Sequence, residues 1–258
     1  KDQSLKRFHP WVFSGAIKKI KNQEGKEIKP EEGAILEVYS NHDEYLGTGH
    51  FQIGSIAIRI ISFTKQNINQ EFWNHKIADA VNVRKKAGLV ENSETNVYRL
   101  IHAEGDGLPG LIVDFYNGTA VIQSHSIGMH LAKQQITEAL KTTLGNSLKA
   151  IYDKSEDTLP KQSAVKATNQ ILFGRPETNT VKENGHLFEV NWETGQKTGF
   201  FIDQRDNRAL LSSFCKGKSV LNTFCYSGGF SVYALKAGAS LVHSVDSSAK
   251  AIDLVNNT

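Results

Sequence analysis

Apolar and polar positions alternate along the first quarter of the chain in the way that short β-strands require. Apolar and β-branched residues fill segments 34–39, 45–51 and 55–63, and Asn, Asp and Gly separate these segments, as expected of turns. Strands at this spacing predict a small barrel or sandwich. Asn69 then begins a helical pattern that ends at Gly88, because the two residues are typical of a helix start and stop.

The middle of the chain combines strand and helix patterns. The segments with strand-like apolar content are 97–102, 111–116, 119–125 and 148–153. The Asn117-Gly118 pair predicts a hairpin turn, and an amphipathic helix is expected over 130–144, ending at Gly145. This order predicts an α/β domain over about 70–180.

The last third of the chain predicts one βαβ unit. Its parts are a buried strand at 218–225, a tight turn at 226–229, a helix at 230–236 and a second strand at 241–245, followed by Asp246. Such units bind nucleotide-like ligands at the carboxyl ends of their strands. The glycines of the turn would let a ligand approach the backbone, and Asp246 would accept hydrogen bonds from ribose hydroxyls.

The turn itself narrows the choice of ligand. The dinucleotide fingerprint G-x-G-x-x-G is absent, since Gly228 and Gly229 are adjacent and Phe224 and Tyr226 crowd the loop. A pyrophosphate needs close backbone approach, whereas S-adenosylmethionine carries no phosphate and tolerates a bulkier loop. Asp246 does not discriminate between a dinucleotide and S-adenosylmethionine, because both contain an adenosine ribose.

Composition excludes several classes of protein. The 258 residues carry a net charge of +3, with 22% charged and 39% apolar residues, which is typical of a folded globular protein. The apolar run at 56–63 is far shorter than the ~18–20 residues of a membrane helix, and no signal-peptide pattern opens the chain. Cys215 and Cys225 form neither a disulfide framework nor a zinc pair. We therefore expect a cytoplasmic protein without a membrane partner.

Both ends of the sequence suggest a longer protein. The chain opens without methionine, and its last segment, 247–258, reads as the start of a helix capped by Ser247 or Ser248. We therefore expect a C-terminally truncated chain.

The first 30 residues are basic, with eight Lys and Arg against three acidic residues. Aromatic side chains interleave with this charge, in the combination that RNA binding uses. The candidate RNA-binding residues are Lys6, Arg7, His9 and Trp11. A solvated basic surface with Trp11 in the core is the alternative, and composition alone leaves the choice open.

His102, Glu104 and Asp106 form a cluster that could suggest a metal site or a catalytic acid–base pair. Three glycines and a proline lie within 104–110, which is turn chemistry, and no second cluster completes a coordination sphere. A structural turn is favoured, and no metal is expected.

Five sequence segments together resemble one family. They are His9-Pro-Trp-Val-Phe-Ser-Gly15, residues 99–114, Gln196-Lys-Thr-Gly-Phe-Phe-Ile-Asp-Gln-Arg205, Asn222-Thr-Phe-Cys-Tyr-Ser-Gly-Gly-Phe230 and Val245-Asp-Ser-Ser248. The family is that of the bacterial ribosomal RNA large-subunit (cytosine-C5)-methyltransferases with an N-terminal PUA domain. The resemblance covers essentially the whole chain, and segment 196–205 is its most specific part.

The resemblance implies an α+β and α/β multidomain fold. A PUA-like β-barrel is expected over 1–70, a middle α/β domain over 71–180, and the beginning of a Rossmann-like class I methyltransferase domain over 181–258. S-adenosylmethionine is the implied cofactor and ribosomal RNA the implied partner. The implied cofactor-binding residues are Thr198, Phe200, Asp203, Arg205, Asn222, Phe224, Tyr226, Ser227, Gly228, Asp246 and Ser247.

Cytosine C5 is a poor nucleophile, so enzymes of this kind add a cysteine thiolate to C6 before C5 attacks the methyl group. Cys225 would face the cofactor and Cys215 would end a helix at 204–214, so neither suits that role. The resemblance places the nucleophile beyond Thr258, and the chain itself is expected to bind cofactor and RNA without methylating.

Two other functions stay open at this stage. One is a different adenosine-nucleotide enzyme on a Rossmann-like unit, such as a dehydrogenase, and the other is a non-catalytic RNA-binding module. The oligomeric state is also open, with a homodimer among the outcomes.

Overall fold

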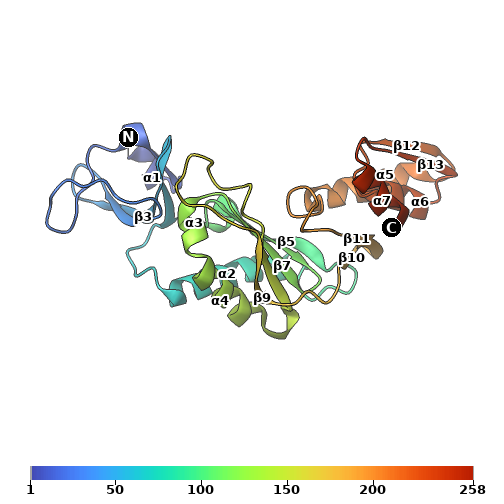
Figure 1. The fold of residues 1–258 in the computed structure, drawn as a ribbon, viewed down its shortest axis with the longest axis horizontal. Coiled ribbons are helices and arrows are strands. Elements are labelled where there is room, and N and C mark those ends of the chain that lie inside the picture. The colour runs from blue at the N-terminus through green and yellow to red at the C-terminus, as the bar shows by residue number, and fades with distance from the viewer. Residues whose placement is uncertain (1, 258) are drawn as a thin grey trace. The chain divides into compact units, whose positions relative to one another are not determined.

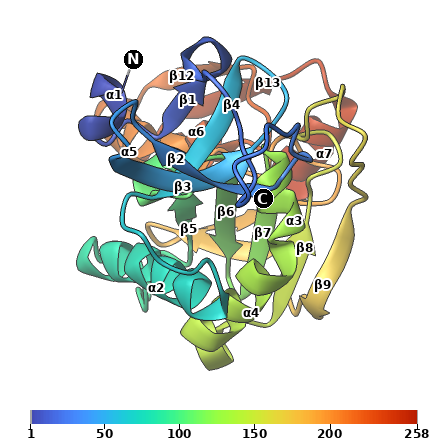
Figure 2. The same ribbon diagram turned by 90° about the vertical axis from the view of Figure 1, so that its left-hand side faces the viewer.

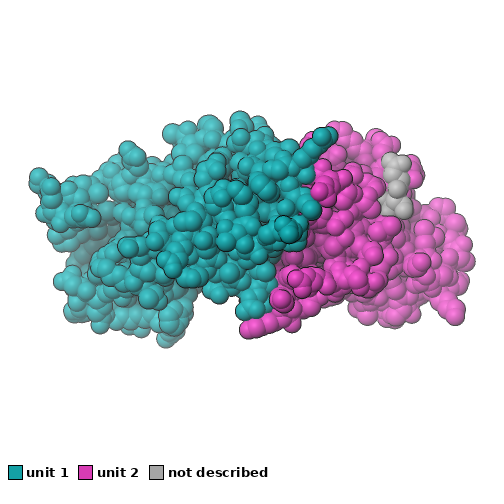
Figure 3. Space-filling view, turned by 90° about the horizontal axis from the view of Figure 1, so that it is seen from below, with its two compact units in different colours: residues 1–83, 100–113, 122–175 teal, residues 84–99, 114–121, 176–258 magenta. Residues whose placement is uncertain are grey.

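The computed structural model describes residues 2–257 and has a mixed α/β architecture (Figure 1). The chain divides into two compact units, coloured separately in Figure 3. Unit 1 comprises residues 1–83, 100–113 and 122–175, and unit 2 comprises residues 84–99, 114–121 and 176–258. No helix in the described part of the chain is both long and apolar enough to cross a membrane.

Unit 1 begins with a four-stranded antiparallel sheet in the order β1-β4-β3-β2. The strands are β1 (Trp11–Phe13), β2 (Ile35–Tyr39), β3 (Tyr45–Phe51) and β4 (Ile56–Ser62), preceded by the short helix α1 (Gln3–Lys6). The three strands expected from alternation are thereby confirmed. The core of this sheet buries Leu5, Val12, Leu46, Phe51, Ala57, Ile58 and Ile60.

A second sheet has five strands in the order β5-β6-β7-β8-β9. These are β5 (Val97–His102), β6 (Leu111–Tyr116), β7 (Thr119–Ser124), β8 (Ala150–Asp153) and β9 (Gln170–Gly174). The helices α2 (Gln70–Lys86) and α4 (Lys133–Leu144) lie below the strands in Figure 2, and Gln70 donates a hydrogen bond to the Gln135 carbonyl. Asn69 caps α2 as expected, since its side chain accepts the Phe72 N–H at 3.1 Å.

The helix expected over 130–144 differs from the observed one. The structure has a separate helix α3 (Ile127–Leu131), and α4 follows after Ala132. Helical structure begins at Ile127, earlier than expected, because this segment contacts His50 on β3 and Gln52 just after β3. Such contacts with distant residues cannot be predicted from the periodicity of apolar residues. The Ile127 N–H donates to the Gln52 side chain at 3.1 Å, and a Cβ on Gly128 would lie 2.1 Å from the His50 ring.

Unit 2 contains a hairpin followed by the βαβ unit. Its elements are β10 (Thr180–Glu183), β11 (His186–Glu189), α5 (Arg205–Cys215), β12 (Ser219–Thr223), α6 (Gly229–Lys236), β13 (Leu241–Val245) and α7 (Ala249–Asn257). β12 and β13 pair in parallel, with Thr223 opposite Val245, so the expected strand–helix–strand order is confirmed. Ser248 caps α7, because its hydroxyl accepts the Ala251 N–H at 3.3 Å.

The expectation that segment 218–225 is a buried strand was wrong. Leu221 is 65% exposed, and Leu241 on β13 is exposed as well. The reason is that β12 and β13 form a two-stranded sheet. Alternate residues of a strand point to opposite faces, and in this sheet one of the two faces is exposed.

A buried ion pair joins three elements of unit 2. The Arg208 guanidinium on α5 donates two 2.8 Å hydrogen bonds to the Glu183 carboxylate on β10, and the two side chains are 2% and 0% exposed. Tyr233 on α6 donates to the same carboxylate at 3.0 Å, and Arg208 also donates to the Phe201 carbonyl at 3.1 Å. The pair therefore fixes α5, β10 and α6 to one another.

Removing one charge of this pair should strongly destabilise unit 2. Glu183→Gln leaves the Arg208 guanidinium buried without a counter-charge, so we expect a loss of about 3–5 kcal/mol in the free energy of unfolding. Urea denaturation followed by circular dichroism measures this change.

The matched control is Glu138→Gln, which breaks an exposed 2.8 Å ion pair with Lys141 and should cost less than about 1 kcal/mol. The double variant Glu183→Met with Arg208→Met should be more stable than Glu183→Gln, because it leaves no unpaired charge. Equal stability of Glu183→Gln and Glu138→Gln would contradict the role assigned to the pair.

Candidate functional site

The loop between β12 and α6 reverses the chain at the carboxyl end of β12. Phe224, Tyr226 and Gly228 all have positive φ angles, of 58°, 48° and 77°. The Cys225 N–H donates to the Val245 carbonyl at 3.0 Å, and the Gly228 N–H donates to the Cys225 carbonyl at 2.8 Å. The tight turn expected here is thus confirmed, and it is tied to the end of β13.

Asp246 follows β13 and lies against this loop. One carboxylate oxygen accepts the Tyr226 N–H and the other accepts the Ser248 N–H, both at 2.9 Å. These backbone donors, first that of Ser248 and then that of Tyr226, lower the pKa of Asp246, so the group is a carboxylate at neutral pH. Each oxygen has further acceptor capacity, so the fixed carboxylate can accept hydrogen bonds from a vicinal diol.

Packing also disfavours a side chain at either glycine of the turn. A Cβ on Gly229 would lie 3.1 Å from the Arg208 side chain, and one on Gly228 would lie 3.1 Å from Val255. The two glycines can therefore be explained by packing as well as by the expected approach of a ligand to the backbone. Asn222 at the end of β12 donates to the Ser231 hydroxyl at 2.8 Å, which lies 2.7 Å from the Ser244 hydroxyl. This chain joins β12, α6 and β13.

Tyr226 connects the loop to segment 196–205. Its hydroxyl accepts the Gln196 N–H at 3.0 Å and donates to the Gly199 carbonyl at 3.2 Å. The Phe201 ring meets the Tyr226 ring edge-on at 5.2 Å. The two sequence motifs are therefore neighbours in unit 2, although Tyr226 lies 30 residues from Gln196 and 27 residues from Gly199 along the chain.

Thr198 and Phe200 are buried within unit 2. The Thr198 hydroxyl donates to Asp114 and lies 2.8 Å from the Tyr116 hydroxyl, and Asp114 also forms two hydrogen bonds with Arg99 at 2.9 and 3.0 Å. The Arg208 guanidinium lies over the Phe200 ring at 4.7 Å. Both side chains therefore hold the segment in place.

The other residues of segment 196–205 and of the loop are more accessible. Asp203 is exposed, and Arg205 is half-buried with its Nη1 buried and without a hydrogen-bonding partner among the described residues. Phe224 is 90% exposed and Ser247 is exposed, whereas Ser227 is buried. The side chains of this set that can meet a ligand are thus the exposed Asp203, Phe224 and Ser247 and the half-buried Arg205 and Asp246.

Both cysteines are buried. The Cys215 thiol donates to the Leu211 carbonyl at 3.2 Å. Burial and, to a lesser extent, the Asp246 carboxylate raise the pKa of Cys225, which disfavours the reactive thiolate. Both thiols are thus shielded from solvent, and the expectation that neither is the nucleophile stays a prediction.

Residues 103–106 form a 3-10 turn, in which the Asp106 carboxylate accepts the His102 N–H. No group of three or more potential metal ligands occurs in the part of the chain that the structure describes. Glu104 instead accepts the Trp11 indole N–H at 2.9 Å. His102, Glu104 and Asp106 therefore lie in and beside a turn, and the Glu104 carboxylate orients the Trp11 ring.

The predicted RNA-binding residues lie at the start of unit 1 in different environments. Lys6 pairs with Glu44 at 2.6 Å and with Asp2 at 3.8 Å. Arg7 and His9 are exposed, and Trp11 is half-buried. On β1 the buried residue is Val12, so Trp11 faces away from the sheet core.

Sequence reasoning missed the residues that hold this site together. These residues are Glu183, Arg208 and Tyr233, and none of them belongs to a recognisable sequence motif. The hairpin that contains Glu183 could, however, have been predicted. Asn184-Gly185, with φ angles of 49° and 78°, is the same hairpin signal as Asn117-Gly118 and would have located β10 and β11.

Comparisons with known proteins agree with this geometry. Residues 1–63 match the family described as a PUA-like domain, and residues 99–256 match the S-adenosylmethionine-dependent methyltransferases. The chain is 39% identical to a ribosomal RNA large subunit methyltransferase I of Photobacterium profundum, and 38% identical to one of Pseudoalteromonas atlantica. Each alignment covers 98% of this chain and 62% of the relative, so the chain spans less than two thirds of their length.

A solved structure has the same fold. It is that of a candidate S-adenosylmethionine-dependent methyltransferase from Streptococcus mutans, with a TM-score of 0.81, 25% identity, and coverage of 99% of this chain and 64% of the other. The family match at residues 99–256 covers more than half of the sequence and includes the loop, Asp246 and segment 196–205. The chain therefore belongs to the S-adenosylmethionine-dependent methyltransferase family.

Proposed function

We propose that this protein transfers a methyl group from S-adenosylmethionine to ribosomal RNA, with C5 of a cytosine in 23S ribosomal RNA as the acceptor. The observation that carries the cofactor part is the Asp246 carboxylate, fixed at the carboxyl end of β13 by two backbone N–H groups. The relatives named as ribosomal RNA large subunit methyltransferases and the PUA-like match support the RNA part.

The residues present fit S-adenosylmethionine. Asp246 would accept hydrogen bonds from both ribose hydroxyls, and the exposed Phe224 ring would offer an apolar wall to the adenine. Arg205 Nη1, which lacks a partner among the described residues, would donate to the carboxylate of the methionine part. The cofactor supplies a methyl group activated by its positively charged sulfur.

Other residues predicted to bind the cofactor would act indirectly, by positioning the segments that contact it. Thr198, Phe200 and Asp203 would belong to the segment that covers the cofactor, with Tyr226 fixing that segment to the loop. Asn222, Ser227, Gly228 and Ser247 would shape the loop. This division of roles stays a prediction.

The loop favours S-adenosylmethionine over a dinucleotide. Phe224 and Tyr226 adopt positive φ angles in place of glycine, so the loop lacks the glycines that let a pyrophosphate approach the backbone at a helix N-terminus. A dehydrogenase is therefore the weaker alternative.

The RNA part of the proposal rests on unit 1. We assign residues 1–70 to an RNA-binding PUA-like domain with a barrel-like arrangement, 71–180 to a middle α/β domain, and 181–258 to the methyltransferase domain. Lys6, Arg7, His9 and Trp11 would contact RNA. Because Cys215 and Cys225 are buried, neither would supply the thiolate that adds to cytosine C6. The family resemblance assigns that thiolate to a cysteine outside residues 1–258, so the proposed methyl transfer would need that cysteine as well.

The first test concerns Asp246. Asp246→Ala should weaken the binding of S-adenosylhomocysteine by about 1–3 kcal/mol, because charged hydrogen bonds to the ribose are lost, which is about 5- to 150-fold in Kd. Titration calorimetry measures it. Asp253→Ala, on the exposed side of α7, removes the same charge and should leave Kd unchanged. Unchanged affinity of a folded Asp246→Ala protein would remove Asp246 from the site.

The second test concerns the contact between Tyr226 and segment 196–205. Tyr226→Phe removes two hydrogen bonds worth about 1–2 kcal/mol together, so the segment should open more often. Trypsin cleavage after the exposed Lys197 should then be about 5- to 30-fold faster. Tyr98→Phe, a hydroxyl removal elsewhere in unit 2, is the control. Equal cleavage rates for both variants would show that the segment is held by other contacts.

The third test concerns RNA. If Lys6 and Arg7 contact phosphates, binding releases counterions, and Lys6→Ala with Arg7→Ala should reduce the slope of log K against log salt by up to ~1–2. Filter binding to ribosomal RNA fragments at several salt concentrations measures the slope. Lys161→Ala with Lys166→Ala removes the same charge from exposed positions of unit 1. The RNA-binding role of Lys6 and Arg7 fails if both double variants have the wild-type slope.

A further inference from the structure

A cavity of about 350 Å³ lies within unit 1. Its lining combines residues from β1, β4, the turn at 103–106 and the strands β5 and β6, together with the residue after β7. The lining residues with aromatic, charged or imidazole side chains are Trp11, Arg59, His102, Glu104 and His125. Cavities of this size hold small organic ligands.

One wall is an aromatic ring with a fixed orientation. The Trp11 indole N–H donates to Glu104 Oε1 at 2.9 Å. The rings of His9 and Phe13 meet the indole edge-on, at 5.5 and 6.4 Å between centroids. An indole held in this way loses little conformational freedom when a planar ligand stacks on it.

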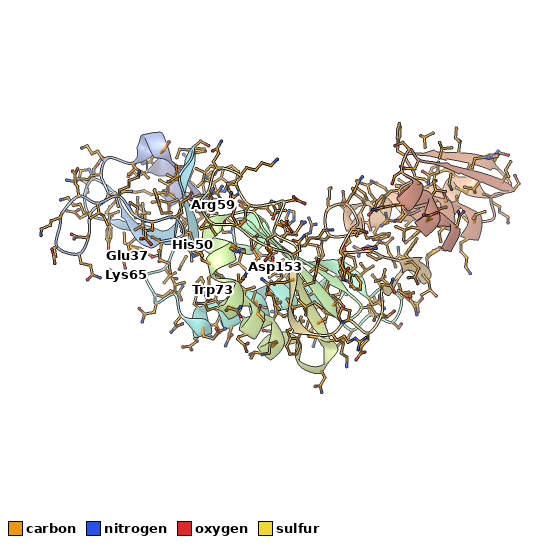
Figure 4. The ribbon with its side chains drawn as sticks, viewed as in Figure 1. Glu37, His50, Arg59, Lys65, Trp73 and Asp153 are labelled. Carbon is orange, nitrogen blue, oxygen red and sulfur yellow. The ribbon has the colours of Figure 1, made fainter. Side chains whose placement is uncertain are left out.

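The charges around the cavity are balanced. Arg59 supplies one cation, and Figure 4 shows it on β4; burial lowers the pKa of its guanidinium, which the nearby Glu104 carboxylate partly offsets. Glu104 supplies one anion, and the imidazoles of His102 and His125 add polar edges. A phosphate site concentrates positive charge, so this combination suits a neutral ligand with both donors and acceptors.

We propose that this cavity binds the base of one unpaired RNA nucleotide. The base would stack on Trp11, accept hydrogen bonds from Arg59 and donate to Glu104, as single-stranded RNA bases do on aromatic rings and polar side chains. Arg7, four residues before Trp11, would contact a neighbouring phosphate. The inference deepens the proposed function, since it rests on RNA being the substrate.

The emission of Trp11 provides a direct readout. Trp73 and Trp192 are 2% and 6% exposed, whereas Trp11 is half-buried, so a stacking base should quench mainly Trp11. Titration with a mixed-sequence single-stranded RNA of about ten nucleotides, a length that one binding domain accommodates, should quench emission to saturation. The duplex of the same sequence should not quench, and Trp11→Phe should abolish the quenching by single-stranded RNA.

Two further variants test the polar contacts. Arg59→Gln should weaken binding of this single-stranded RNA by about tenfold, whereas Arg175→Gln, which removes a charge from an exposed position of unit 1, should have a much smaller effect. Glu104→Gln preserves an acceptor for the Trp11 indole and should alter the preference among oligonucleotides of single-base composition. Circular dichroism verifies that each variant is folded.

The outcomes separate the two proposals. Single-stranded RNA that binds without quenching, and with equal affinity for wild type, Arg59→Gln and Glu104→Gln, would overturn the base-binding cavity and leave the RNA methyltransferase proposal intact. Binding of S-adenosylhomocysteine without binding of any RNA would overturn both the RNA substrate and the cavity proposal. Tighter binding by Glu104→Gln to all sequences alike would identify the cavity as a phosphate site and contradict the inference.

Discussion

The buried ion pair between Arg208 and Glu183 is the contact on which the rest of unit 2 depends. Two buried charges are costly unless each meets the other with good geometry, and here the guanidinium and carboxylate form two parallel hydrogen bonds of 2.8 Å. Because Arg208 also holds the Phe201 carbonyl and packs against Gly229, one side chain positions segment 196–205 and the start of α6. The candidate cofactor loop lies between these two elements.

The loop and Asp246 support each other. The Tyr226 N–H orients the carboxylate, while the Tyr226 hydroxyl holds the backbone of Gln196 and Gly199. A change at Asp246 therefore alters the loop as well as any ribose contact. The loop and Asp246 therefore form one structural unit.

The sequence predicts much of the secondary structure and the place of the site, because these depend on neighbouring residues. Alternation located β2, β3 and β4, and the strand–helix–strand order placed Asp246 beside the loop. Other features depend on distant partners. The exposure of Leu221 follows from a sheet of two strands, the start of α3 depends on Gln52 and His50, and the burial of Arg208 depends on Glu183. The Asn184-Gly185 turn between β10 and β11, in contrast, could have been predicted from its local sequence but was not.

We propose that the loop and Asp246 form a site for S-adenosylmethionine rather than for a dinucleotide. The most direct measurement is calorimetric titration of this chain with S-adenosylmethionine, in the absence and in the presence of excess NAD. We expect saturable binding of one S-adenosylmethionine per chain, with the same affinity in both titrations. Displacement of S-adenosylmethionine by NAD, or binding of NAD alone, would contradict it.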